Sequence, residues 1–172
     1  IERLDYTKGI LEKFEAIELL IKKHPELKNK FYFIQVVVPS RNNQLENKKL
    51  LAKIRQKTSE INGEHNDLSH NIIHFIYKPL DLPAVTALYK KADILLVTPL
   101  IDGMNLIAKE YIACRNKPGQ VILSEFAGCA HELFCAKLIN PFNIESITSN
   151  IKNFLKEPMP EKTKKIFTLV QE

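Results

Sequence analysis

The chain has 172 residues, of which 45% are hydrophobic, and a formal net charge of +5 at pH 7. This is enough for one domain with a buried core, and no apolar run reaches the roughly 18 residues that predict a membrane span. The basic residues are interleaved with acidic ones, which argues against a nucleic-acid-binding face. Three cysteines without CxxC spacing and five scattered histidines predict neither a disulfide framework nor a metal site, so we expect a reduced, cytoplasmic protein.

The first predicted element is an amphipathic helix over residues 8–23, and the loop before it carries two cations. Apolar residues recur at helical spacing from Ile10 to Ile21. Arg3 and Lys8 therefore lie between a strand and a helix, where a guanidinium and an ammonium group can converge on phosphate oxygens. The alternative is that both side chains are simply solvated, although cations at a helix start oppose the helix dipole and so favour a compensating anion.

The rest of the chain alternates between apolar runs and helix-like segments. Strands are predicted at residues 31–38, 72–77, 94–98, 121–124 and 137–140, helices at 44–61, 82–91, 104–114 and 144–155, and a polar turn at 62–67. Continuous apolar strands between helices predict an α/β fold with a doubly wound, mostly parallel sheet that is covered on both faces. Such sheets bind ligands at the carboxyl ends of their strands.

Residues 102–110 place two carboxylates around the start of the helix predicted at 104–114. Asp102 follows a strand, Gly103 permits a tight turn, and the next backbone amides point out from a helix amino terminus, where anions bind. Glu110 lies about two turns further along, near the same face, where it can accept both hydroxyls of a ribose. This layout fits a sugar nucleotide. The alternative is a capping Asp and a solvated Glu.

Four short segments occur in a fixed order along the chain: RLDYTKG at 3–9, VPSR at 38–41, DGMNLIAKEY at 102–111 and LSEFAG at 123–128. In these motifs and their order, from Arg3 to about Asn143, the chain resembles the carboxyl-terminal half of the trehalose-6-phosphate synthases. The resemblance implies the Rossmann-like carboxyl-terminal domain of a two-domain, GT-B type glycosyltransferase, with residues 1–172 as one UDP-glucose-binding domain. It also implies a fragment without the first strand and the amino-terminal acceptor domain, which we expect to be inactive alone.

Roles for single residues follow from the resemblance. It implies that Arg3 and Lys8 hold the donor diphosphate and that Asp102 contacts the transferred glucose, and these three are the expected catalytic residues. Glu110 matches the acid that binds the uridine ribose, and Arg41 matches an arginine that faces the 6-phosphate of the acceptor. The implied donor-binding residues are Arg3, Lys8, Leu80, Gly103, Met104, Asn105, Leu106, Ile107 and Glu110.

The implied reaction is retaining glucosyl transfer from UDP-glucose to glucose 6-phosphate, giving trehalose 6-phosphate and UDP. A retaining hydrolase would carry two carboxyl groups about 5 to 5.5 Å apart, and the sequence assigns no such pair. The resemblance implies instead a front-face displacement in which the departing phosphate oxygen helps to deprotonate the acceptor hydroxyl. No metal or other cofactor is expected, and the sequence has no Asp-x-Asp element to hold a divalent ion.

Two other functions stay open from the sequence. One is a non-catalytic scaffold or regulatory subunit of a trehalose synthase complex, and the other is a different GT-B sugar-nucleotide transferase, because one fold hosts several activities. The expected partners are UDP-glucose and glucose 6-phosphate, with no nucleic acid and no membrane. The sequence leaves open a homo-oligomer or a trehalose synthase complex.

Overall fold

The structure is a computed structural model, which describes residues 1–40, 44–65, 70–157 and 164. The strands are β1 (Glu2–Arg3), β2 (Phe33–Val38), β3 (Ile73–Tyr77), β4 (Ile94–Val97), β5 (Gln120–Ser124) and β6 (Lys137–Ile139). The α-helices are α1 (Ile10–Lys23), α2 (Gln44–His65), α3 (Leu82–Lys91), α4 (Leu106–Cys114) and α5 (Ile144–Lys156). Short 3-10 helices cover Tyr6–Lys8, Pro25–Leu27 and Gly128–His131.

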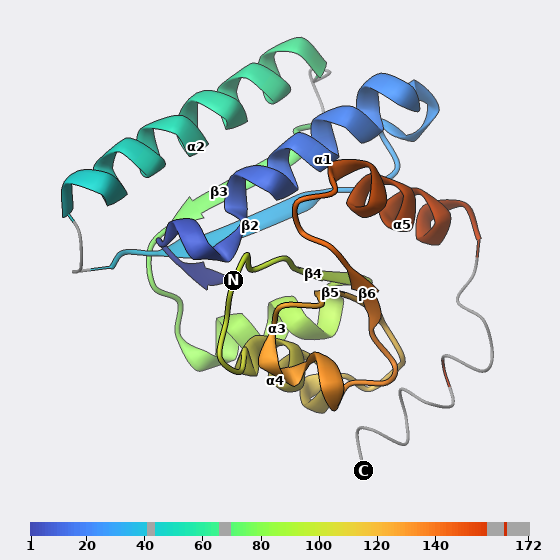
Figure 1. The fold of residues 1–172 in the computed structure, drawn as a ribbon. Helices are drawn as coiled ribbons and strands as arrows, with labels where there is room; N and C mark the ends of the chain where they lie inside the picture. Colours follow the sequence, from blue (N-terminus) through green and yellow to red (C-terminus); the bar gives the residue numbers. More distant parts are fainter. Residues whose placement is uncertain (41–43, 66–69, 158–163, 165–172) are drawn as a thin grey trace.

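The strands pair in parallel and lie between two layers of helices. Their order is β1-β2-β3 in one three-stranded sheet and β4-β5-β6 in another. Helices α1, α2 and α5 lie on one side of the strands, and α3 and α4 lie on the other (Figure 1). The predicted parallel α/β fold with helices on both faces is therefore confirmed, and the hydrogen-bonded ladders divide into two sheets.

Strand β5 shows why these sequences form a parallel sheet. Val121, Ile122 and Leu123 are all fully buried, because helices cover both faces of the strand. Ile122 packs into the core beneath α1, α2 and α5, whereas its neighbours Val121 and Leu123 pack into the core around α4. Among the described helices, none is both long and apolar enough to span a membrane.

The polar turn predicted at residues 62–67 is wrong for its first four residues. Residues 62–65 belong to α2, which continues to His65, while residues 66 and 67 lie outside the described residues. The side chain of Asn62 accounts for the difference, since it donates to the carbonyl of Ile73 at 2.9 Å and accepts from the amide of Ile73 at 3.0 Å. These bonds fix the end of α2 to β3 and offset the low helix propensity of Asn and Gly.

A buried ion pair fixes β1 against α1. The ammonium group of Lys13 lies 2.6 Å from Glu2 Oε1, and both side chains are almost fully buried. Gln35 of β2 donates to the other carboxylate oxygen of Glu2 at 3.4 Å. The pair therefore holds the strand that ends at Arg3 to the helix that follows Lys8, which sets the position of the loop between them.

Candidate functional site

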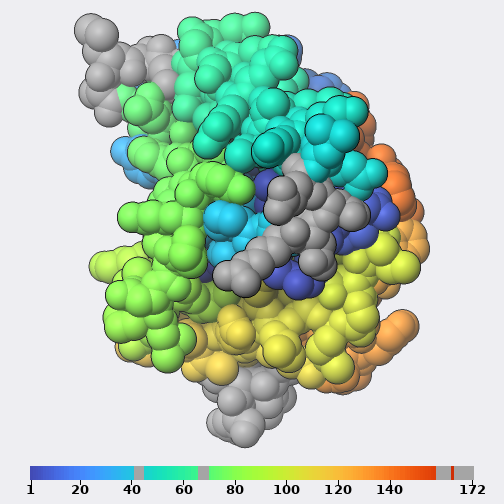
Figure 2. Space-filling view, turned by 90° about the vertical axis from the view of Figure 1, so that its left-hand side faces the viewer, coloured from blue at the N-terminus to red at the C-terminus, as the bar shows by residue number. Residues whose placement is uncertain are grey.

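Three loops meet at the carboxyl ends of β1, β4 and β5. The amide of Leu100 donates to the carbonyl of Thr7 at 2.7 Å, which joins the loop after β4 to the loop after β1. The amide of Asp102 donates to the carbonyl of Phe126 at 3.3 Å, and the amide of Gly128 donates back to the carbonyl of Asp102 at 3.0 Å. Figure 2 looks onto this end of the molecule, where the dark blue amino-terminal segment borders the yellow segment near residue 100.

Gly9 makes the close approach of the first two loops possible. It has a left-handed φ of 61°, and a Cβ atom at this position would lie 2.0 Å from the carbonyl oxygen of Thr98. The hydroxyl of Thr98 donates in turn to the carbonyl of Gly9 at 3.1 Å. Glycine is therefore required here both by the backbone conformation and by the contact, and Lys8 is held beside the end of β4.

Lys8 and Asp102 form the centre of the site. Their side chains come from loops 94 positions apart, and the Lys8 ammonium lies 2.6 Å from Asp102 Oδ2. The two side chains are 14% and 15% exposed, respectively. Burial alone would raise the pKa of Asp102, but the hydrogen bonds from Lys8 and then from Asn105 outweigh it and lower the pKa below its ordinary value. Asp102 is therefore a carboxylate at neutral pH, and Lys8 is its counter-ion.

Asn105 begins α4 in an unusual conformation. It has a left-handed φ of 68°, its residue is 8% exposed, and its Nδ2 donates to Asp102 Oδ2 at 3.0 Å. Its Oδ1 is buried and has no hydrogen-bond partner within the described part of the chain. A non-glycine residue with positive φ and an unpaired buried oxygen both cost free energy, and such features concentrate at functional sites.

The prediction that Gly103 permits the tight turn before α4 is wrong. Asn105 is the left-handed residue of this turn, while Gly103 has no positive φ and a Cβ at Gly103 would meet no atom within 4 Å. Gly128 is the glycine that the turn requires, because a Cβ there would lie 1.9 Å from the carbonyl oxygen of Gly103. The loop after β5 thus presses directly against the turn that opens α4.

The amino terminus of α4 has properties that suit an anion. Asn105 makes no side-chain capping hydrogen bond, and the first turn contains no acidic residue. The first amides of the helix, including those predicted at Leu106 and Ile107, are therefore not occupied by a capping side chain. Free helix-terminal amides and the helix dipole both favour a bound anion.

The remaining predicted residues surround this centre. Arg3 is exposed at the end of β1, and Leu80 is half-buried between β3 and α3. Met104 and Leu106 are exposed beside the Lys8–Asp102 pair. Arg41, the predicted acceptor-phosphate residue, lies outside the described residues.

Glu110 has a partner that the sequence analysis did not identify. The hydroxyl of Tyr89, on α3, donates to Glu110 Oε2 at 3.2 Å. Tyr89 is buried and Glu110 is exposed. The apolar pattern of α3 predicts Tyr89 as a core residue. The sequence signal for a partner was the hydroxyl of Tyr89, because a buried tyrosine normally has a hydrogen-bond partner.

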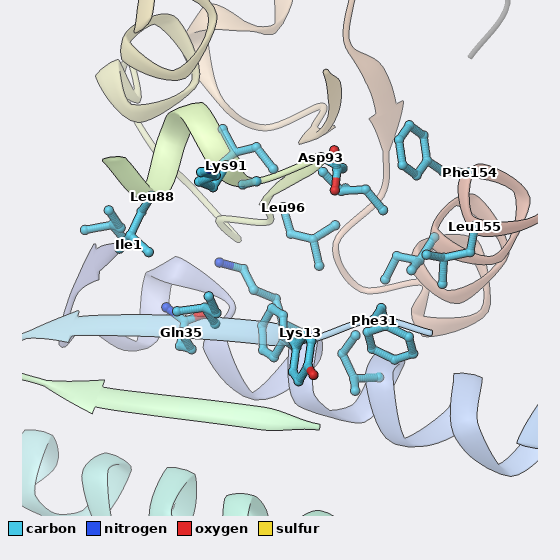
Figure 3. A pocket seen from close by; sticks show the side chains of 18 of the residues that line it. Ile1, Lys13, Phe31, Gln35, Leu88, Lys91, Asp93, Leu96, Phe154 and Leu155 are labelled. Carbon is cyan, nitrogen blue, oxygen red and sulfur yellow. The ribbon is translucent and has the colours of Figure 1, made fainter. Parts of the chain in front are cut away.

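A cavity of about 590 Å³ lies elsewhere, between the amino-terminal halves of β2 and β4. Figure 3 shows its mainly apolar lining, with Phe31 and Leu96 from the two sheet regions and Phe154 and Leu155 from α5. Lys13, Gln35, Lys91 and Asp93 also line it, but it contains none of the residues predicted to bind donor or acceptor. The candidate site is therefore the loop cluster at the carboxyl ends of the strands.

The described residues contain no group of three or more His, Cys, Asp or Glu side chains arranged to hold a metal ion. The cations of the site are instead Arg3 and Lys8, which lie at the end of β1 and on the adjoining loop.

Comparisons with known proteins identify the family of the chain. The whole chain, residues 1–172, matches the model of glycosyltransferase family 20. The chain is 43% identical over 166 residues to the UDP-forming alpha,alpha-trehalose-phosphate synthase A of Dictyostelium discoideum, which covers 96% of this chain and 23% of the relative. It is 37% identical over 170 residues to the trehalose-6-phosphate synthase of Mycobacterium leprae, covering 98% of this chain and 34% of the relative. The chain thus spans about a third or less of the length of these relatives.

Solved structures agree in fold over nearly the whole chain. An alpha,alpha-trehalose-phosphate synthase from Burkholderia xenovorans in complex with glucose-6-phosphate has a TM-score of 0.92 at 33% identity, covering 99% of this chain and 38% of that one. A structure described as trehalose-6-phosphate from E. coli bound with UDP-2-fluoro glucose has a TM-score of 0.91 at 31% identity, covering 98% and 38%. The resemblance inferred from the four motifs is confirmed, and the chain belongs to glycosyltransferase family 20.

Proposed function

We propose that this chain is the donor-binding domain of a retaining glucosyltransferase that transfers glucose from UDP-glucose to glucose 6-phosphate, giving trehalose 6-phosphate and UDP. The observation that carries the proposal is the Lys8–Asp102–Asn105 cluster at the uncapped amino terminus of α4. The relatives named as UDP-forming trehalose-phosphate synthases support the choice of donor, and the relative in complex with glucose-6-phosphate supports the choice of acceptor.

The diphosphate of the donor binds among the positively charged groups of the site. Arg3, Lys8 and the first amides of α4 all lie around the carboxyl ends of β1 and β4. Lys8 is paired with Asp102, so donor binding requires Lys8 to turn from a carboxylate to a phosphate. The diphosphate therefore replaces Asp102 as the anion beside Lys8, and the carboxylate of Asp102 keeps its hydrogen bond from Asn105.

Asp102 is placed to receive the glucosyl group. The side-chain hydrogen bonds from Lys8 and Asn105 both end on Oδ2, and the backbone amide of Met104 also donates to the carboxylate. Oδ1 accepts neither of the two side-chain bonds, and it is the oxygen that we assign to a sugar hydroxyl. The buried Oδ1 of Asn105 provides a second acceptor in the same turn, and a sugar hydroxyl that donates to it would remove the cost of an unpaired buried oxygen.

Catalysis follows from charge that develops on the leaving group. The bond from the glucosyl C1 to the diphosphate oxygen breaks, the bond from C1 to the acceptor oxygen forms on the same face, and the acceptor proton passes to the departing phosphate oxygen. Arg3, Lys8 and the α4 amides stabilise the negative charge on the diphosphate as the bond breaks. This sequence of steps needs no metal ion, and metal independence, cytoplasmic location and oligomeric state stay predictions.

Calorimetric titration of the chain with UDP, UDP-glucose and ADP, with and without magnesium, tests the donor assignment. We expect uridine-selective binding that does not need the metal and that Lys8→Ala weakens. Lys22→Ala is the matched control, because it removes the same charge at the far end of α1, where Lys22 pairs with Glu18 at 2.8 Å. Equal binding by both variants, or no preference for uridine in a folded chain, would contradict the proposal.

A further inference from the structure

Tyr89 reaches Glu110 from a neighbouring helix. Its hydroxyl lies 3.2 Å from Glu110 Oε2, and the Tyr89 residue is 3% exposed. Among the described residues, Tyr89 is the hydrogen-bond donor to the Glu110 carboxylate. A long, exposed side chain on a helix otherwise samples several rotamers, and ordering it upon ligand binding costs conformational entropy. A fixed hydroxyl beside it reduces that cost before the ligand arrives.

The tyrosine is itself held rigidly. Its ring packs edge-on against the ring of Tyr111, with centroids 6.1 Å apart and planes at 87°. Arg115 Nη1 donates to the Tyr89 carbonyl at 3.0 Å and its guanidinium lies 5.0 Å from the centre of the Tyr111 ring. The hydroxyl of Tyr111 donates to the carbonyl of Ala92 at 3.0 Å. These contacts join α3 to α4, so the direction of the Tyr89 hydroxyl is set by the core.

The Tyr89 hydroxyl is a donor at any working pH. Burial raises the pKa of Tyr89 far above its ordinary value, and the negative charge of Glu110 raises it further. A protonated phenol can donate one hydrogen bond, and an ionised carboxylate offers about four acceptor positions on its two oxygens. The bond from Tyr89 therefore occupies one position on Oε2, orients the plane of the carboxylate, and leaves Oε1 and the rest of Oε2 for a ligand.

We propose that Tyr89 is a positioning residue for Glu110, and that through it the chain selects a ribonucleotide over a 2′-deoxyribonucleotide. This inference rests on the proposed function, in which Glu110 accepts the ribose hydroxyls of the donor. Tyr89 does not touch the ligand. It holds the carboxylate in the orientation in which it can accept the 2′- and 3′-hydroxyls together.

The test compares the dissociation constants of UDP and 2′-deoxy-UDP by calorimetry on the intact natural protein. The wild type is expected to prefer UDP by on the order of tenfold, as for a hydrogen bond to a charged group. Tyr89→Phe removes one hydroxyl and is expected to lower this preference about threefold or more, because UDP loses the aligned bonds of two hydroxyls and 2′-deoxy-UDP loses that of one. In a Glu110→Gln background, Tyr89→Phe is expected to change the preference no further, because the two residues act as a unit.

Tyr111→Phe is the matched control. It removes a hydroxyl from the same aromatic pair, but that hydroxyl bonds to a backbone carbonyl and not to Glu110. This variant is expected to lower the unfolding temperature while keeping the wild-type preference for UDP. A merely structural role for Tyr89 would make the two variants alike in ligand preference, and that result would overturn the inference.

A further measurement needs no substitution. The ¹³Cζ resonance of Tyr89 in labelled protein is expected to shift upon addition of UDP and to shift less with 2′-deoxy-UDP, and equal shifts would overturn the inference even if Tyr89→Phe failed to fold. The same titrations distinguish a failure of the proposed donor site from a failure of the positioning role of Tyr89. A wild type that binds no UDP would overturn the proposed donor site as well, whereas a wild type that prefers UDP, with the same preference in Tyr89→Phe, would overturn the positioning role alone.

Discussion

Replacing Asp102 by Asn separates the two ligand groups that the site is proposed to bind. The substitution keeps the shape of the side chain and removes the charge that lies 2.6 Å from the Lys8 ammonium. Lys8 then has no carboxylate partner to leave when a diphosphate binds. A partly exposed ion pair contributes about 1 kcal/mol at most, so UDP affinity is expected to stay level or to rise by up to about fivefold.

UDP-glucose is expected to respond in the opposite direction. Asp102→Asn loses a charge-assisted hydrogen bond to the sugar, worth about 1.5–3 kcal/mol, so the affinity for UDP-glucose relative to UDP falls by about 12- to 150-fold. Calorimetry with both ligands measures the ratio. Asp93→Asn is the matched control, because it makes the same chemical change before β4, where the side chain is 69% exposed. Equal losses for UDP and UDP-glucose would refute the division of roles.

The same variant gives a prediction about pH. The hydrogen bonds from Lys8 and Asn105 outweigh burial and lower the pKa of Asp102 in the folded chain. A depressed pKa contributes stability above the unfolded value of about 3.9, and this is lost as the pH falls through the folded value. The difference in unfolding free energy between wild type and Asp102→Asn, about 1 kcal/mol or less, is therefore expected to shrink below about pH 4. A difference that grows in acid would contradict the reasoning.

Two further predictions concern the backbone and the buried ion pair, both measured by urea unfolding. Gly9→Ala places a Cβ atom 2.0 Å from the Thr98 carbonyl oxygen in a left-handed conformation, and it is expected to lower the free energy of unfolding by more than about 1 kcal/mol. The added Cβ of Gly103→Ala meets no atom within 4 Å, so that variant is expected to stay within about 0.5 kcal/mol of the wild type. Similar costs for the two variants would contradict the glycine assignment. Lys13→Met leaves Glu2 buried without its cation and is expected to cost about 3–5 kcal/mol. Adding Glu2→Gln to Lys13→Met should recover part of that loss, and no recovery would contradict an ion-pair cause.

The sequence predicted the architecture well because the signals are local. Apolar runs and helical periodicity placed each α-helix and strand from 10 to 156, since burial on both sides of a parallel sheet leaves a continuous apolar strand. The wrong prediction at residues 62–65 has a tertiary cause that the sequence does not show, because the side chain of Asn62 bonds to the backbone of Ile73 in β3. The composition of residues 62–65 predicts a turn, but the tertiary contact between Asn62 and Ile73 keeps them helical.

The sequence predicted on which loops the candidate residues lie, but not the contacts between their side chains. The motifs placed Lys8 and Asp102 on loops at one edge of a sheet, but nothing in a single sequence shows that residues 94 positions apart form an ion pair. Gly103 was assigned the turn because glycine is the usual left-handed residue, while Asn105 adopts that conformation. Tyr89 was not predicted as a residue near the site, because its contact with Glu110 depends on where its hydroxyl points.

Product analysis of the intact natural protein tests the central claim most directly. Incubated with UDP-glucose and glucose 6-phosphate, the protein is expected to form trehalose 6-phosphate and UDP with the anomeric configuration of the donor retained, as followed by NMR. Lys8→Ala is expected to lower kcat by on the order of 100-fold, as for the loss of one group that stabilises transition-state charge, with Lys22→Ala unchanged. No trehalose 6-phosphate from a folded protein that binds both substrates, or a product of inverted configuration, would contradict the account.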